Sequence, residues 1–157
     1  MEIEPQPKPT LDFKLEFLFS RRSLVRREVV GVVGQGFRVN LFVEGGTVNG
    51  PALCGTCGAG SDWFTLRQDG VGIIDSRVTI RASSGAIISC TYSGVADFGE
   101  TAFDRLQSGE MPTSGPIHIA ARFETAAPEF MWLNRILAIG IGRNDPEGNL
   151  WDTYAIR

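Results

Sequence analysis

An alternation of apolar and polar side chains with a period of two residues is the feature that most constrains the fold of this chain. Residues 74–81 show it most clearly, with Ile74, Val78 and Ile80 on one face of an extended segment and Asp75, Arg77, Thr79 and Arg81 on the other. This pattern is typical of a β-strand that buries one of its faces. The chain is therefore predicted to consist mainly of half-buried strands.

Turn signals rich in Gly, Pro, Asn and Asp separate the other segments of strand-like composition. The predicted strands cover residues 11–19, 37–43, 62–66, 73–82, 86–93, 117–125, 133–142 and 150–156. One short helix is predicted over residues 100–107, because Ala102, Phe103 and Leu106 form an apolar face and Gly109 is a stop signal. Many short strands favour an all-β fold, a single closed antiparallel β-barrel with one short helix, since closure removes exposed strand edges.

Two stretches are predicted to interrupt the strands. The first is a basic cluster that comprises Arg21, Arg22, Arg26 and Arg27. It is interpreted as a solvated turn, with binding of an anionic ligand as the alternative. The second is the Gly-rich run at 45–51, which is predicted to end a strand, because a phosphate-binding loop would have to open a helix and no helical pattern follows.

The length of 157 residues suits one domain, predicted over residues 11–157. Residues 1–10 are predicted to be a disordered tail, since three prolines forbid regular strand pairing there. A net charge of -3 gives no reason to expect nucleic acid as a partner. The sequence shows neither a long apolar run nor a secretory signal, so no membrane span and a cytoplasmic location are expected.

Three cysteines raise the question of a metal or redox site. Cys54 and Cys57 have the C-x-x-C spacing of a zinc half-site, but no second such pair follows and the single histidine, His118, is far away in sequence. The Gly-rich residues 58–61 that follow are expected to form a loop. Free thiols lining a turn are therefore expected, with no metal ligands and no cofactor.

Residues 122–143 form the stretch in which a functional site is expected. Its second half is predicted to be a buried strand with Ile136, Leu137, Ile139 and Ile141 as apolar residues. Polar groups cluster around the preceding turn, namely Glu124, Trp132, Asn134 and Arg135. Buried polar groups need partners, so these side chains are expected to satisfy one another or to face a polar cavity.

The sequence from about Leu11 onward resembles the domain-of-unknown-function family numbered 3237. The most specific pieces are Gly45-Gly46-Thr47 with Gly50-Pro51, Asp62-Trp63, Asp69-Gly70-Val71, Asp75 with Arg77, Phe123-Glu124-Thr125, Ala127-Pro128 and Trp132-Leu133-Asn134. The resemblance implies a calycin-like closed β-barrel similar to allene oxide cyclases and dirigent proteins, which shape reactive small molecules without a cofactor. Val78 and Ser89 stand where the family pattern has tyrosines, which suits a more apolar substrate.

The leading hypothesis is a cofactor-independent isomerase, lyase or cyclase of a biosynthetic pathway that shapes a hydrophobic, natural-product-like small molecule inside the barrel. The candidate catalytic residues are Glu124, His118 and Asp75 for proton transfer and Arg77 for a developing oxyanion. Arg77 is expected to be ion-paired and to line the cavity. The candidate substrate-binding residues are Trp63, Asp62, Tyr92, Trp132 and Asn134.

Two alternatives use the same barrel. The first is a non-catalytic carrier of a hydrophobic small ligand, and the second is a structural barrel with a filled interior, since a fold does not determine its function. For Asp75 and Arg77 the alternative is a polar stripe facing solvent, and for His118 a histidine without a catalytic role. A hydrophobic small molecule is the expected partner, and assembly into a homo-oligomer is left open.

Overall fold

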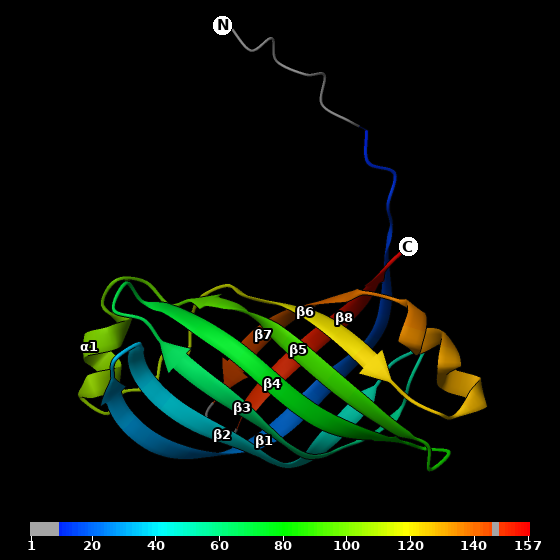
Figure 1. Ribbon diagram of the computed structural model, residues 1–157, viewed down its shortest axis with the longest axis horizontal. Coiled ribbons are helices and arrows are strands. Elements are labelled where there is room, and N and C mark those ends of the chain that lie inside the picture. Colours follow the sequence, from blue (N-terminus) through cyan, green and yellow to red (C-terminus); the bar gives the residue numbers. More distant parts are fainter. Residues whose placement is uncertain (1–9, 146–147) are drawn as a thin grey trace, which may run out of the picture.

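The computed structural model describes residues 10–145 and 148–157, which form a closed barrel of eight antiparallel strands (Figure 1). In chain order the elements are β1 (Leu15–Val33), β2 (Gly36–Asn49), β3 (Gly55–Leu66), β4 (Val71–Ala82), β5 (Ile87–Asp97), α1 (Ala102–Gln107), β6 (Ile117–Glu124), the 3-10 helix η1 (Pro128–Arg135), β7 (Ala138–Asp145) and β8 (Gly148–Ile156). Each strand pairs with its neighbours in sequence, and β8 closes the barrel on β1. The predicted fold class is confirmed, whereas the predicted tail lies almost wholly outside the described residues.

The two short helices lie at opposite ends of the barrel (Figure 1). At one end, the Phe103 ring of α1 packs edge-on against Phe37 of β2, with 6.3 Å between ring centroids, and Leu106 is buried. At the other end, η1 buries Leu133. No helix in the described part of the chain is long and apolar enough to cross a membrane.

The faces of β4 lie as the alternation predicts. Ile74, Val78 and Ile80 point into the barrel, together with Ser76, while the side chains between them lie on the outer face. This strand has no bulge in its pairing with β5, so the two-residue period is kept along its whole length.

The first strand differs from its prediction in both extent and facing. β1 begins at Leu15, and a register shift between Phe17 and Phe19 reverses the facing of the side chains there. Phe19 is therefore buried, as predicted, whereas Leu15 and Phe17 lie on the outer face, and Leu11 and Phe13 precede the strand and are exposed. The alternation in the sequence is regular, but a bulge decides which half of it faces the core.

The predicted turn at the basic cluster is wrong, because β1 runs straight through it. Arg21 pairs with Val48 of β2 on one side and with Trp151 of β8 on the other. Arg21 points into the barrel, whereas Arg22 and Arg26 point outward. The cluster is thus divided by the pleat of a strand, which places one guanidinium inside the core.

The Gly-rich runs also belong to strands rather than to the predicted loops. Gly46 lies in β2 and Gly60 in β3, and both allow a neighbouring strand to approach closely. A Cβ atom at Gly46 would lie 1.9 Å from the carbonyl oxygen of Arg22, and one at Gly60 would lie 2.3 Å from that of Arg77. Bulged and glycine-bearing strands of this kind bend, which a small closed barrel requires.

The strand predicted over residues 133–142 is replaced by η1 and by β7, and its facing is inverted. The inward positions of β7 are Ala138, Gly140 and Gly142, whereas Leu137 and Ile141 are 47% and 42% exposed. The reason is steric, because the interior here is already filled by side chains of the two neighbouring strands. A Cβ atom at Gly140 would lie 2.6 Å from Ile119, and one at Gly142 would lie 2.4 Å from the ring of Trp151.

Replacing Gly142 with Ala is expected to destabilise the protein by about 1–3 kcal/mol, the usual range for an overpacked core. The new methyl group would push the buried Trp151 ring from its position. Urea unfolding measures the loss, and Gly34→Ala is the control, because a Cβ atom at Gly34 meets no atom within 4 Å. Equal stability of the two variants would contradict the close approach of Gly142 to Trp151.

Candidate functional site

A layer of polar side chains crosses the interior of the barrel. The buried polar residues at inward positions are Arg21, Ser23, Asp62, Ser76 and Thr153, to which the buried Tyr92 adds a phenol. Asp62 of β3, Ser76 of β4 and Tyr92 of β5 lie side by side, because the strand register pairs Asp62 with Ser76 and Ser76 with Tyr92. Interior polar groups are uncommon in a small barrel, and this layer therefore marks the candidate site.

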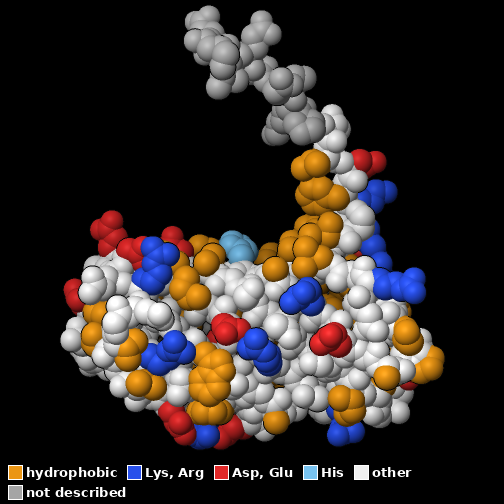
Figure 2. Space-filling view, viewed as in Figure 1, with side chains coloured by type: hydrophobic (Ala, Val, Ile, Leu, Met, Phe, Trp, Pro, Cys, Tyr) orange, Lys and Arg blue, Asp and Glu red, His pale blue; other side chains and the backbone are white. Residues whose placement is uncertain are grey.

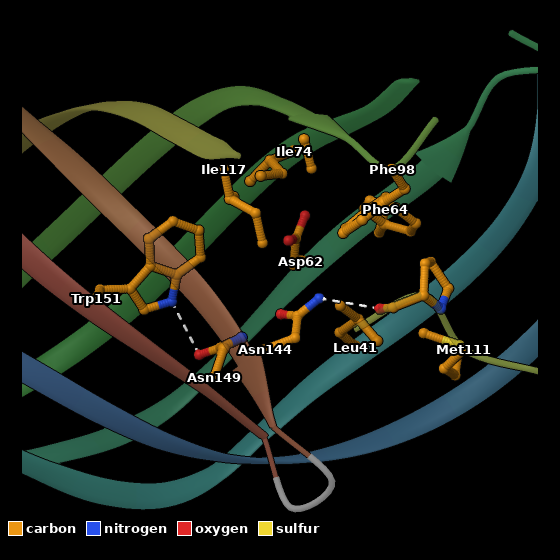
Figure 3. A pocket seen from close by; sticks show the side chains of 12 residues that line it. Leu41, Asp62, Phe64, Ile74, Phe98, Met111, Ile117, Asn144, Asn149 and Trp151 are labelled. Atoms are coloured by element: carbon orange, nitrogen blue, oxygen red, sulfur yellow. Dashed lines mark hydrogen bonds between the residues drawn. The ribbon is translucent and has the colours of Figure 1, made fainter. Parts of the chain in front are cut away.

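A pocket with mostly apolar walls adjoins this layer at Asp62 and is lined in part by the segment that follows α1 (Figure 3). The free space among its side chains, including the part that opens to solvent, is about 400 Å³. The lining residues are Leu41, Asp62, Phe64, Ile74, Ala96, Phe98, Met111, Pro112, Ile117, Asn144, Asn149 and Trp151. Asp62 is the one ionisable residue among them.

Hydrogen bonds hold the polar rim of the pocket in place. The indole nitrogen of Trp151 donates to Asn149 Oδ1 at 2.9 Å, and Asn144 Nδ2 donates to the carbonyl oxygen of Pro112 at 3.4 Å (Figure 3). The second bond joins β7 to the segment after α1, which forms part of the pocket wall. Both amides lie within reach of a molecule in the pocket.

The environment of Asp62 brings its titration close to neutral pH. Its side chain is 7% exposed, and Oδ1 accepts a hydrogen bond from the backbone N–H of Asp75 at 3.0 Å. Burial raises the pKa of Asp62 to about 7, because the ionised form loses its hydration. The hydrogen bond and the charges of Arg21 and Arg38 oppose this shift without cancelling it. Asp62 can therefore both release and accept a proton under physiological conditions.

Arg21 is a buried cation beside this carboxyl group. Its guanidinium carbon lies 4.7 Å from the centroid of the Tyr92 ring, and its Nη1 atom has no hydrogen-bond partner in the described part of the protein. Burial acts against the charge, but the neighbouring Tyr92, Cys57 and Cys90 outweigh it and raise the pKa of Arg21 above its ordinary value. The guanidinium is thus charged inside the barrel.

Tyr92 connects the cation with the pocket. Burial raises the pKa of its phenol, partly offset by Arg21 and by hydrogen bonding to Ser76. The Tyr92 ring also contacts Trp151, with 5.5 Å between ring centroids, and Trp151 lines the pocket. Arg21, Tyr92 and Trp151 therefore form a continuous stack that ends at the pocket floor.

The two thiols of the C-x-x-C pair have different surroundings. Cys57 points into the barrel, 3.6 Å from Ser23 Oγ, whereas the exposed Cys54 donates to the carbonyl oxygen of Gly50 at 3.2 Å. The third thiol, Cys90, is buried, and burial raises its pKa to about 11. Within residues 10–145 and 148–157, no group of three or more His, Cys, Asp and Glu side chains could hold a metal ion.

The expectation that Arg77 lines the cavity is wrong. Its ion pair with Asp75 is present, at 3.1 Å, but both side chains are more than half exposed on the outer face of β4. Their inward neighbour is Ser76. The alternative of a solvent-facing polar stripe is the one observed, and charged side chains lie scattered over the outer surface (Figure 2).

The other two candidate acids and bases also lie outside the barrel. His118 and Glu124 share one face of β6, as predicted, but it is the outer face, because the inward positions are taken by apolar residues. Trp63 is 40% exposed and packs edge-on against Phe42 on the outer surface. These placements remove all three side chains from the interior pocket.

Trp132 and Asn134 lie at the far end of the barrel. Asn134 accepts the backbone N–H of Thr125 at 2.8 Å and donates to its carbonyl oxygen at 2.9 Å, which fixes the chain between β6 and η1. The half-buried Trp132 ring contacts the guanidinium of Arg157 at 5.4 Å. Glu124 and Asn134 line an open surface depression here, so the structure brings them together as expected but not in the interior.

Of the candidate residues predicted from sequence, Asp62 and Tyr92 lie in the barrel interior. The sequence pattern places Arg21 in a solvated basic cluster and assigns no role to Trp151. The period-two relation of Arg21 to Phe19 and Ser23 was the available signal for an inward arginine.

The fold and the pocket define a class of protein, a closed eight-stranded barrel in which the carboxyl group of Asp62 is buried in the wall of a mostly apolar pocket. The family model described as "Protein of unknown function (DUF3237)" matches residues 13–156, and the chain belongs to this family. A UPF0311 protein of Rhodopseudomonas palustris (strain TIE-1) is 26% identical over 151 residues, which cover 94% of this chain and 98% of that protein.

Solved structures share the whole barrel. A beta-barrel like protein from Acinetobacter baumannii AYE superposes with a TM-score of 0.78 at 27% identity, covering 98% of this chain and 100% of that one. A conserved protein of unknown function from Rhodopseudomonas palustris gives a TM-score of 0.83 at 20% identity, with coverage of 94% and 100%. An enzyme from Penicillium herquei gives 0.72 at 24% identity, with coverage of 99% and 100%.

Proposed function

We propose that this protein is a cofactor-independent isomerase, lyase or cyclase that acts on a hydrophobic small molecule in the interior pocket, with Asp62 as its acid/base group. The observation that carries the proposal is the buried carboxyl group of Asp62 in the wall of an apolar pocket, with a pKa of about 7. Groups that titrate near the working pH are the most effective in general acid–base catalysis.

The pocket suits such chemistry in two ways. Its apolar walls, which include Phe64, Phe98 and Trp151, can hold a folded substrate in a reactive conformation. The Asp62 carboxylate can remove a proton from carbon or oxygen, and the acid so formed can return it to a different atom or to a leaving group. The first outcome is an isomerisation or a cyclisation, and the second is an elimination.

A comparison adds limited support. The Penicillium herquei protein of the same fold is described as an enzyme. At 24% identity the likeness extends to the fold alone, so it supports the capacity of this barrel to host catalysis and not a particular reaction.

The proposal is tested with nitrobenzisoxazole, a flat apolar compound whose ring opens when a base removes its one acidic C–H proton. The N–O bond then breaks, and the released electron pair appears on a coloured cyano-nitrophenolate. The parent protein should open the ring at a rate that rises with pH and levels off above about 7. Asp62→Asn, which keeps the shape of the side chain, should lower the rate by about 100-fold or more.

Glu124→Gln is the matched control, because it neutralises a carboxyl group on the outer face. Its rate should equal that of the parent protein. Equal rates in the parent and in Asp62→Asn would refute the role of Asp62, and a loss confined to Glu124→Gln would move the chemistry to the surface depression. Native mass spectrometry and the ring-opening assay together distinguish an enzyme from a carrier. A carrier would retain a small molecule unchanged and would show no turnover that depends on Asp62.

A further inference from the structure

We infer that the interior pocket is specific for ligands with one acidic oxygen, a phenol or an enol, and that Arg21 binds this oxygen as its anion. The inference rests on the proposed function, because it concerns the same pocket and names the class of substrate. Arg21 is the residue that determines this specificity.

The first argument is the missing partner of a buried donor. Nη1 of Arg21 is buried and has no hydrogen-bond partner among the described residues. Buried donors in native proteins almost always have a partner, and an unsatisfied one needs an explanation such as a bound ligand. The Nη1 atom belongs to a charged group. Leaving a buried charged group without a hydrogen-bond partner costs more free energy than leaving a neutral one without a partner.

The second argument is the absence of an ion pair in direct contact with Arg21 among the described residues. Among the described residues no carboxylate oxygen lies within 4.0 Å of the Arg21 guanidinium. The contacts that stabilise it are the face of the Tyr92 ring and the polarity of the Tyr92 hydroxyl group. The charge of Arg21 acts on Asp62 without an ion pair in direct contact. Burying a cation is costly unless it is paired, and an anion of the ligand in direct contact would reduce this cost.

The third argument concerns access from the pocket. Arg21 lies directly opposite Trp151 in the register of β1 and β8, and the Tyr92 ring beneath the guanidinium touches the same indole. Arg21 is not itself among the lining residues of the pocket, but Trp151 and Asp62 are, and the charge of Arg21 acts on Asp62. An oxygen at the inner end of a ligand would reach the guanidinium between these two side chains.

The number of free donors indicates the kind of anion. A carboxylate is recognised best by two parallel N–H donors of one guanidinium, whereas a phenolate or an enolate presents one oxygen atom. Among the described residues, Nη1 is the one guanidinium nitrogen of Arg21 that is buried without a partner. Its two N–H groups leave from a single nitrogen, so they suit one oxygen atom better than the two parallel oxygens of a carboxylate. The aromatic and apolar lining of the pocket also fits the body of a phenol or an enol.

Para-nitrophenol is the test ligand, because its ionisation is visible in its absorption spectrum. An apolar pocket without a cation would raise the pKa of the bound phenol. Arg21 should instead lower it by about one unit or more, which corresponds to a roughly tenfold preference for the anion. Para-nitroanisole, which has the same shape but cannot ionise, should bind about tenfold more weakly at pH 8, and para-nitrobenzoate more weakly than the phenolate.

Arg21→Met separates the charge from the packing, since it keeps a long side chain and removes the cation. In this variant the preference for the phenolate over the anisole should disappear. If the variant does not fold, the pKa of para-nitrophenol bound to the parent protein tests the role of Arg21 by itself, and a lowered pKa supports it. A raised pKa, or equal binding of phenol and anisole, would overturn the role of Arg21 and leave the proposed function standing. Failure of both compounds to bind would refute the pocket, and with it the proposed function.

Discussion

Asp62→Asn is expected to be as stable as the parent protein near pH 4 and more stable by about 4 kcal/mol at pH 8. The folded protein holds a proton on Asp62 up to a pKa of about 7, whereas the unfolded chain releases it near the ordinary value of 3.8. Between these two values the folded state binds more protons than the unfolded state. The contribution of Asp62 to the stability of the parent protein therefore falls as the pH rises from about 3.8 to about 7. Above pH 7 this contribution no longer changes with pH.

The measurement is urea unfolding of both proteins at intervals between pH 4 and pH 8. The difference between the two curves isolates Asp62, because the other titrating groups are common to both proteins. Glu124→Gln, a change of an exposed carboxyl group, should give a curve parallel to that of the parent. If the Asp62→Asn curve also runs parallel to the parent curve, the carboxyl group ionises as freely inside the barrel as in water, and its proposed catalytic role loses its basis.

A gain in stability on removing a carboxyl group would itself be informative. A carboxylate retained at a cost in stability, in the wall of an open pocket, is the pattern expected of a functional group rather than of a structural one. The same argument applies to Arg21, whose Nη1 atom has no hydrogen-bond partner among the residues that the structure describes.

The closed barrel could be predicted from sequence because its evidence is spread over many segments. In residues 74–81 the two-residue period is unbroken, and the observed facing of β4 follows it. The helix at 100–107 was also found, within two residues of its observed start at Ala102. Errors at single elements do not change a conclusion that rests on the whole pattern.

The facing of β1 and β7 could not be predicted, because it depends on tertiary contacts. A bulge next to Phe17 exchanges the two faces of β1, and nothing in the local alternation marks it. In β7 the apolar isoleucines suggested a buried face, but the space inside is filled by Ile119 and Trp151, so glycines face inward. Hydrophobicity alone does not show which of two apolar faces has room.

The candidate site was predicted only in part for the same reason. Asp62 and Tyr92 were identified as binding residues, whereas the candidate catalytic groups Glu124, His118, Asp75 and Arg77 lie on the outer face. A charged side chain on a strand is usually interpreted as solvent-facing. Arg21 is the exception, and its inward position continues the two-residue period of the buried Phe19 and Ser23.

Tyr92→Leu is expected to destabilise the protein by about 3–5 kcal/mol, the usual loss when one partner of a buried charge is removed. The change deletes the ring that lies 4.7 Å from the Arg21 guanidinium and the hydroxyl group that hydrogen-bonds with it. Tyr154→Leu is the matched control, since Tyr154 is the other tyrosine of the chain and packs against Phe17 on the outer face. It should lose about 1 kcal/mol or less.

A double variant shows whether the loss at Tyr92 arises from the stranded cation or from the cavity. If Arg21 is the cause, adding Arg21→Met to Tyr92→Leu should restore part of the stability, since no charge is then left unpaired. The two changes would be non-additive by more than about 1 kcal/mol, as expected for residues in direct contact. Additive losses would mean that the loss of stability in Tyr92→Leu arises from packing alone. The buried polar side chains would then have a structural role only. Non-additivity would show that Tyr92 stabilises a charged guanidinium in the barrel interior, which the proposed role of Arg21 requires.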